Sequence, residues 1–176
     1  MDVYFLRHAN AGNSVDDPEE DEKRPLDPLG VEQSQRMGRV LAALDVKLDS
    51  IISSPLVRAK QTAAHAAAAL GYEKTVLLDN ALRPDGKFDD FMTLLRRHAK
   101  ADAIMVVGHN PSLSEFLSLL VSDEATPVTI DLKKGAVARL ERKSRRSELQ
   151  WILTPKLVQT IQEASATSSR PKTSRK

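Results

Sequence analysis

The feature that most constrains the fold is a regular alternation between short apolar runs and segments with helical apolar spacing. Residues 3–6, 50–53, 75–78 and 103–107 have the character of strands, and each is followed by a predicted helix, directly or after a loop. The run at 103–107 is apolar throughout, which is typical of a central strand covered on both faces. Strands that alternate with helices favour a parallel sheet between helical layers. We therefore predict an α/β fold, a three-layer α/β/α sandwich with a mostly parallel central sheet.

Local signals place the boundaries of several elements. Asp27 and Pro28 have the chemistry of a helix start, and Gly71 ends an alanine-rich helix that begins at Pro55. Six acids stand among the seven residues 16–22, and because like charges repel we predict a loop there. The remaining predictions are helices at 88–98 and 111–121 and strands at 128–132, 136–141 and 148–153.

A length of 176 residues suits a single domain. We assign residues 1–162 to this domain and residues 163–176 to a basic C-terminal tail, which we expect to be disordered because it is rich in Ser, Thr, Lys and Arg. The tail holds four positive charges and one negative charge, which leaves 22 positive and 23 negative charges elsewhere. The globular part is thus not basic, and we expect no nucleic-acid partner.

The chain contains no cysteine, which excludes disulfides and thiol catalysis. Its first ten residues lack the basic start and long apolar run of a signal peptide. No stretch reaches the roughly 18 apolar residues that a membrane-spanning helix needs. We therefore expect a cytoplasmic protein that has no membrane partner.

Two of the four histidines directly follow predicted strands. His8 follows the first strand and His109 follows the strand at 103–107, so the carboxyl edge of a parallel sheet would bring them into one crevice. Arg7 precedes His8, and Arg58 lies in the first turn of the alanine-rich helix. Guanidinium groups hold phosphate oxygens in pairs, and helix starts favour anions. The sequence therefore predicts a pocket for a phosphate dianion.

This set of residues suits phosphoryl transfer to histidine. A histidine beside a bound phosphate can attack phosphorus in line with the leaving group. We predict His8 as that nucleophile, with Arg7, Arg58 and His109 binding the phosphate and stabilising the charge on its oxygens. His8 must be neutral when it attacks, with one ring nitrogen held by a hydrogen bond that fixes the tautomer. A protonated His109 would suit so negative a group.

Three motifs, in order along the chain, carry a family resemblance. Residues 7–9 (RHA) resemble the Arg-His-Gly signature of the histidine phosphatase superfamily. Residues 54–62 (SPLVRAKQT) resemble its Ser-Pro-x-x-Arg-Ala-x-Gln-Thr segment, and residues 108–109 (GH) stand where its second essential histidine is found. The Pro-Leu pair at 25–26 and the ending WILTPK at 151–156 are most similar to SixA-type phosphohistidine phosphatases.

The resemblance covers residues 1–158 and implies a phosphoglycerate mutase-like fold. It implies His8 as the phosphorylated nucleophile, with Arg7, Arg58 and His109 completing the pocket. SixA-type members remove phosphate from histidine in the phosphotransfer domains of sensor-kinase relays, so the resemblance implies a phosphorylated protein as substrate. We expect no cofactor and no metal, because no set of His, Asp and Glu shows close ligand spacing.

The chain also departs from the family pattern. Ala9 replaces the signature glycine, and Asn110 stands where some phosphatases carry an aspartate. The region 79–85, where a general acid is expected, contains no glutamate; Asp85 is the candidate acid there, and Asn10 is a further candidate site residue. A positioned general acid speeds the departure of an alkoxide leaving group about 10²- to 10⁴-fold. An imidazole leaves more easily. The missing glutamate therefore favours P–N over P–O substrates.

Other interpretations stay open at this point. The chain could be a phosphatase of small phosphate esters with Asp85 as its acid, or a phosphate-binding module without catalysis. The acidic segment 16–22 is either a solvated loop or a lining of the pocket mouth that repels polyanions such as nucleotides. The basic tail is either a solvated terminus or a weak anion binder.

Overall fold

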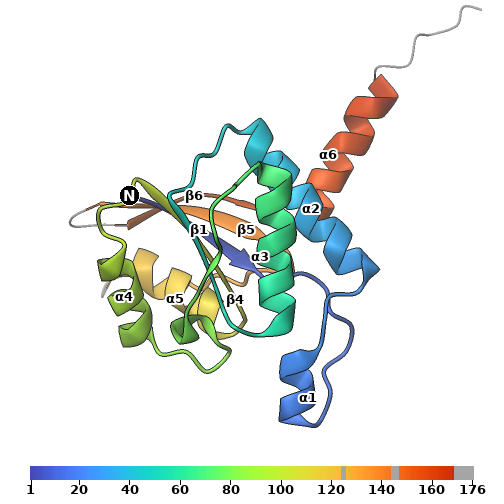
Figure 1. The fold of residues 1–176 in the computed structure, drawn as a ribbon. Coiled ribbons are helices and arrows are strands. Elements are labelled where there is room, and N and C mark those ends of the chain that lie inside the picture. The colour runs from blue at the N-terminus through green and yellow to red at the C-terminus, as the bar shows by residue number, and fades with distance from the viewer. Residues whose placement is uncertain (124–125, 144–146, 169–176) are drawn as a thin grey trace, which may run out of the picture.

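The computed structural model describes residues 1–123, 126–143 and 147–168. Its strands are β1 (Asp2–Arg7), β2 (Ser50–Ser53), β3 (Leu77–Leu78), β4 (Ala103–Gly108), β5 (Val137–Arg142) and β6 (Ser147–Leu153). They form one six-stranded sheet in the order β3-β2-β4-β1-β5-β6 (Figure 1). The pairs β3–β2, β2–β4 and β4–β1 are parallel, whereas β5 runs antiparallel to β1 and β6 antiparallel to β5. The predicted α/β architecture with a mostly parallel sheet is confirmed.

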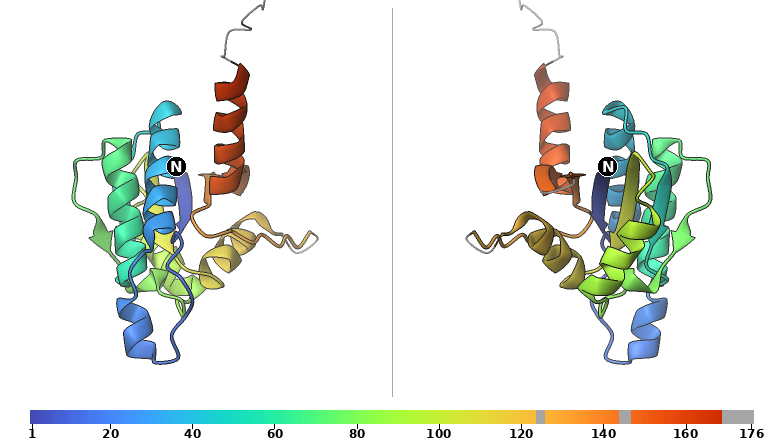
Figure 2. Two further views of the ribbon diagram at one scale, coloured as in Figure 1. Left: turned by 90° about the vertical axis from the view of Figure 1, so that its right-hand side faces the viewer. Right: turned by 90° about the vertical axis from the view of Figure 1, so that its left-hand side faces the viewer.

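Helices cover both faces of this sheet. The helices are α1 (Pro18–Lys23), α2 (Pro28–Ala43), α3 (Val57–Leu70), α4 (Phe88–Arg97), α5 (Ser112–Val121) and α6 (Pro155–Ser168), with a short 3₁₀ helix at Asn80–Leu82. The pair α2 and α3 lies on one face, and α4 and α5 lie on the other, while α1 lies beyond the sheet below α3 and α6 projects from the body beside α2 (Figures 1 and 2). No helix in the described part of the chain is long and apolar enough to cross a bilayer.

The two faces of the sheet bury two separate apolar cores. Because side chains alternate along a strand, Val3 and Phe5 of β1 pack with α4 and α5, whereas Tyr4 and Leu6 pack with α2 and α3. Every residue of β4 is buried, as predicted for a strand covered on both sides. The strand ends that carry the candidate site are thus fixed between two packed layers.

Several predicted boundaries are confirmed. The carboxylate of Asp27 caps α2 by accepting from the N–H of Gly30 at 2.8 Å. Gly71 ends α3 in the left-handed conformation, with φ of 79°. The predicted third strand at 75–78 is shorter than expected, because only Leu77 and Leu78 pair with β2.

The acidic segment is not a loop, which corrects the prediction for 16–22. Residues 18–23 form α1, and Asp17 caps this helix by accepting from the N–H groups of Glu19 and Glu20. Pro18 occupies the first helical position, where its missing N–H costs nothing. Acids in a first turn also interact favourably with the positive end of the helix dipole. The cap and the favourable interaction with the helix dipole therefore outweigh the repulsion among the acidic side chains.

The predicted strand at 128–132 is wrong as well. This segment pairs with no strand of the described sheet, although its sequence is apolar at alternate positions. Serine side chains four residues apart on and just after α5 satisfy its backbone instead. The donors and acceptors are Val128 N–H to Ser122 Oγ, Ile130 N–H to Ser118 Oγ and Leu132 N–H to Ser114 Oγ, at 2.8, 2.9 and 3.0 Å.

The end of the chain also differs from the prediction. Helix α6 was not expected, and it continues to Ser168, inside the tail predicted to be disordered from Glu163. Its first turn is held by the buried Val158, while residues 161–166 are exposed. The basic end at 169–176 lies outside the described residues.

Candidate active site

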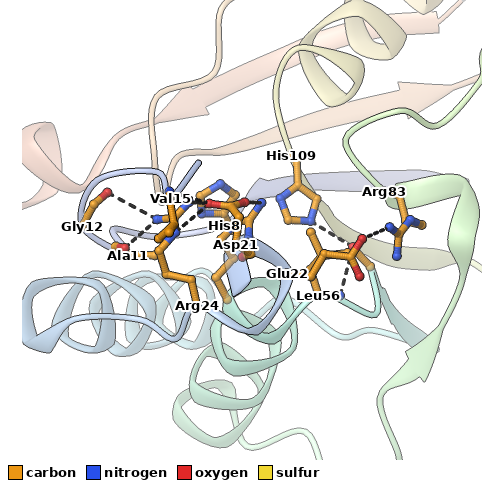
Figure 3. Close-up of polar contacts among 12 residues, drawn as sticks. His8, Ala11, Gly12, Val15, Asp21, Glu22, Arg24, Leu56, Arg83 and His109 are labelled. Atoms are coloured by element: carbon orange, nitrogen blue, oxygen red, sulfur yellow. Dashed lines mark hydrogen bonds and ion pairs between the residues drawn. The ribbon is translucent and has the colours of Figure 1, made fainter. Parts of the chain in front are cut away.

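The two histidines predicted from the strand ends lie against each other. His8 follows β1 and His109 follows β4, and these strands are adjacent and parallel. The ring centroids are 4.9 Å apart, with an angle of 49° between the ring planes (Figure 3). Only 7% of His8 and 1% of His109 is exposed. The carboxyl edge of the sheet therefore brings two residues a hundred positions apart into one buried pair.

The tautomer of His8 follows from a single hydrogen bond. Its Nδ1 lies 2.8 Å from the carbonyl oxygen of Ala9. A carbonyl oxygen can only accept, so Nδ1 carries the proton and Nε2 carries the free lone pair. Burial lowers the pKa of His8 to about 4, and the charges of Arg58 and Arg7 act in the same direction. At neutral pH the ring is therefore uncharged, which is the state that the nucleophile predicted from the sequence requires.

His109 is also neutral in this structure. Its Nε2 forms a 2.9 Å hydrogen bond with the Oγ of Ser54, a residue that the sequence analysis did not single out. Its Nδ1 is buried and has no partner among the described residues. Burial, the neighbouring ring of His8 and the charges of Arg58 and Arg83 together lower the pKa of His109 to about 2. A protonated His109 would suit a bound dianion, but the lowered pKa keeps His109 unprotonated at neutral pH in the pocket as it stands.

Arg7 and Arg58 each direct part of their guanidinium to the backbone. Arg7 Nη1 donates to the carbonyl of Leu132 at 2.7 Å, and Arg58 Nη1 donates to that of Asp21 at 2.7 Å. The Nε of both arginines is buried without a partner among the described residues, like Nδ1 of His109. Buried polar atoms usually have a partner, and a guanidinium Nε can only donate. Two unpaired Nε groups near the histidine pair therefore mark a site for an acceptor-rich group such as phosphate.

Helix α1 brings carboxylates to the same place, which the sequence analysis allowed only as a lining of the pocket mouth. Asp21 lies on the side of His8, where its Oδ2 is 3.2 Å from Arg58 Nη2 and its Oδ1 is 2.8 Å from Arg24 Nη2. Glu22 lies on the side of His109 and forms an ion pair with Arg83 (Figure 3). Only the position of these acids soon after the first strand hinted at this arrangement.

The remaining candidates lie around this centre. The amide of Asn10 donates to Asp27 at 2.6 Å, and its oxygen accepts from Lys134 at 3.2 Å. Asn10 thus links the segment after β1 to the residue that caps α2. The Asp85 side chain is 83% exposed and lies 3.6 Å from Arg83. No hydrogen bond or ion pair within the described ranges joins Asp85 to either histidine.

Asn110 and Ala9 have structural contacts as well. The amide of Asn110 donates to the carbonyl of Leu132 at 3.0 Å, beside the bond from Arg7 to the same oxygen. Ala9 is fully buried, and its N–H donates to Thr62 on α3 at 3.0 Å. For metals, no group of three or more His, Asp or Glu able to hold an ion occurs in the part of the chain that the structure describes.

Comparisons with known proteins show what this chain is similar to. The family model for the histidine phosphatase superfamily (branch 1) matches residues 3–84. An uncharacterised protein of Picosynechococcus is 33% identical over 165 residues, covering 89% of this chain and 98% of that protein. The phosphohistidine phosphatase SixA of Escherichia coli is 25% identical over 158 residues, covering 88% and 94% of the two chains.

A solved structure of SixA, a protein histidine phosphatase complexed with tungstate, superimposes on this chain with a TM-score of 0.78. The two are 23% identical, and the match covers 89% of this chain and 98% of the other. At this level of identity the superposition establishes the fold.

Proposed function

The chain belongs to the histidine phosphatase superfamily, and from this premise we propose that it is a phosphatase that acts through a phosphohistidine on His8 and dephosphorylates phosphohistidine on another protein. The observation that carries the proposal is the buried pair of His8 and His109, with Nε2 of His8 left free for attack. The similarity to SixA over nearly the whole chain supports the choice of substrate class.

In the first step His8 Nε2 attacks the phosphorus of the substrate. A bond forms between Nε2 and phosphorus, and the bond from phosphorus to the substrate imidazole breaks on the opposite side. Arg7, Arg58 and His109 stabilise the charge on the three equatorial oxygens. The Ala9 carbonyl keeps the proton of His8 on Nδ1, where it offsets the negative charge of the new phosphohistidine.

The leaving group needs no acid from the protein. In the substrate phosphohistidine, the ring nitrogen that carries no phosphate is protonated. When the P–N bond breaks, the imidazole therefore leaves as a neutral group. Water then attacks the phosphorus on His8, releasing inorganic phosphate and returning Nε2 with its lone pair. An alkoxide, by contrast, must gain a proton as it leaves.

The carboxylates of the site support this preference. Asp21 and Glu22 are both ion-paired with arginines. Burial acts to raise the pKa of Asp21, but the hydrogen bond from Arg24 and the nearby positive charges outweigh it and hold that pKa below its ordinary value. A carboxylate in this state has no proton to donate. The pocket is thus better suited to P–N than to P–O bonds.

The test combines trapping of the intermediate with a change of the nucleophile. Radiolabelled phosphohistidine protein should transfer label to His8, and His8→Ala should lose at least about a thousandfold in turnover. His65→Ala, a histidine on α3 outside the pair, serves as the control. Turnover that persists in His8→Ala would exclude the mechanism, and faster turnover of a sugar phosphate than of the phosphohistidine protein would exclude the substrate class.

A further inference from the structure

Asp21 contacts the two terminal nitrogens of Arg58, the arginine that binds phosphate in the proposed function. Arg58 Nη1 donates to the backbone carbonyl of Asp21 at 2.7 Å, and Nη2 lies 3.2 Å from the Asp21 carboxylate. Both terminal nitrogens of Arg58 therefore contact one residue, whereas Nε is buried without a partner in the part of the chain that the structure describes. The Arg58 side chain is 6% exposed and that of Asp21 is 22% exposed, so solvent screens this contact only partly.

Helix α1 holds the carboxylate in this position from several sides. Arg24 pairs with the other oxygen of Asp21, and it also donates to the carbonyl of Ala11 in the segment after β1. On the other side of α1, the ion pair between Glu22 and Arg83 attaches the helix near His109 (Figure 3). The contact of Asp21 with Arg58 is thus part of an anchored arrangement.

A phosphate dianion cannot use the whole of Arg58 while Asp21 remains in place. A bidentate contact needs two parallel N–H groups of one guanidinium. Asp21 takes the terminal edge formed by Nη1 and Nη2, which leaves the edge formed by Nε and the second N–H of Nη2 for a phosphate. A dianion at Nε and Nη2 would also bring like charges together in a largely buried site, where repulsion is stronger than in water. Binding of phosphate and the Asp21–Arg58 contact therefore compete.

We infer that Asp21 is a specificity-determining residue that acts as an internal competitor of phosphate at Arg58. Each substrate must bind its phosphate against the negative charge of this carboxylate, which lies 3.2 Å from Arg58 Nη2. A free phosphate or a small ester has little beyond its phosphate to offset this cost, whereas a protein substrate contributes further contacts. Asp21 thereby weakens binding of small phosphate anions and assists release of the product. This inference rests on the proposed function, because it takes Arg58 to be a phosphate ligand.

The test is equilibrium binding of inorganic phosphate, measured by calorimetry, which requires no turnover. Asp21→Asn removes the charge and keeps the side-chain size, and it should tighten phosphate binding about fivefold, in the range that partly buried charged contacts contribute. Glu20→Gln is the matched control: it removes the same charge from the neighbouring, exposed position of α1, and we expect less than about a twofold change there. Circular dichroism and thermal melts check that both variants fold.

The outcomes separate this inference from its alternatives. If Asp21 instead positions Arg58 for phosphate, Asp21→Asn will weaken binding, and the inference is overturned. Unchanged binding, or equal tightening in Glu20→Gln, also overturns it, because then the contact or its location has no specific effect. Arg58→Ala tests the premise separately: if it leaves phosphate affinity unchanged, the proposed pocket itself is wrong, whatever Asp21→Asn does.

Discussion

At the scale of single residues, His8 and His109 have lower pKa values than a histidine exposed to water. Imidazole in water has a pKa near 6.5, but burial holds the pKa of His8 at about 4 and that of His109 at about 2. A lowered histidine pKa means that the neutral form persists further into acid. Both rings are therefore neutral at every pH at which a nucleophilic His8 would be needed.

The corresponding prediction concerns their titration. Between pH 7 and pH 4.5, ring C–H resonances in NMR spectra should show His8 and His109 mainly neutral, with His8 half-protonated only near pH 4. Addition of tungstate should raise both pKa values, because a bound dianion offsets the positive charge of the arginines. The His8→Ala variant assigns the resonances. A midpoint near 6.5 for either ring without the anion would contradict the arrangement described here.

At the scale of elements, strand periodicity and helix caps made much of the fold predictable. The apolar run at 103–107 reveals a central strand, and the positions of His8 and His109 after strands lead directly to their contact. These inferences succeed because apolar strand runs are local properties of the sequence, and because parallel strands end at the same edge of a sheet. The segment at 128–132 is apolar at alternate positions, as a strand would be, yet serine hydroxyls on and just after α5 accept from its N–H groups. A local pattern does not reveal which partner satisfies the backbone.

The site shows the same division between local and tertiary information. His8, Arg7, Arg58 and His109 belong to short motifs and could be selected from the sequence. Ser54 as the partner of His109 and Asp21 as the partner of Arg58 depend on how α1 and α3 meet at the end of the sheet. For α1 the prediction weighed repulsion among acids and missed the cap from Asp17.

The contact between α2 and α3 gives a prediction at this scale. Gly38 is buried in α2, and a methyl group at this position would collide with the Ala66 carbonyl and the Ala69 side chain of α3. In an exposed helix Gly→Ala gains about 1 kcal/mol, but overpacking costs about 1–3 kcal/mol. We expect Gly38→Ala to lower the free energy of unfolding by up to about 2 kcal/mol in urea titrations. Ala64→Gly, at an exposed position of α3, measures the effect of helix propensity alone for comparison. If Gly38→Ala instead raised the free energy of unfolding, α2 and α3 could move apart without cost.

At the scale of the whole molecule, the unpaired nitrogens of the pocket connect anion binding to folding. Arg7 Nε, Arg58 Nε and His109 Nδ1 are buried and have no partner within the described ranges. Each such group costs about 1–3 kcal/mol of desolvation that no hydrogen bond offsets. These nitrogens belong to residues on or just after β1, β4 and α3, which come together only in the folded chain, so the unfolded chain has no equivalent site. An anion that supplies acceptors to them binds the folded state alone, and stability must rise with its concentration.

Tungstate should therefore raise the thermal midpoint of unfolding. At a concentration one hundred times its dissociation constant, binding to the folded state contributes about 2.7 kcal/mol, which for a chain of this size corresponds to about 5–10 °C. Sodium chloride at equal ionic strength should give a much smaller change, because screening does not satisfy buried nitrogens. Arg58→Ala should lose most of the increase, since it removes one of the three nitrogens together with its charge. An increase of the same size in Arg58→Ala would mean that tungstate stabilises the protein from another location, and the pocket around His8 and His109 would no longer explain anion binding.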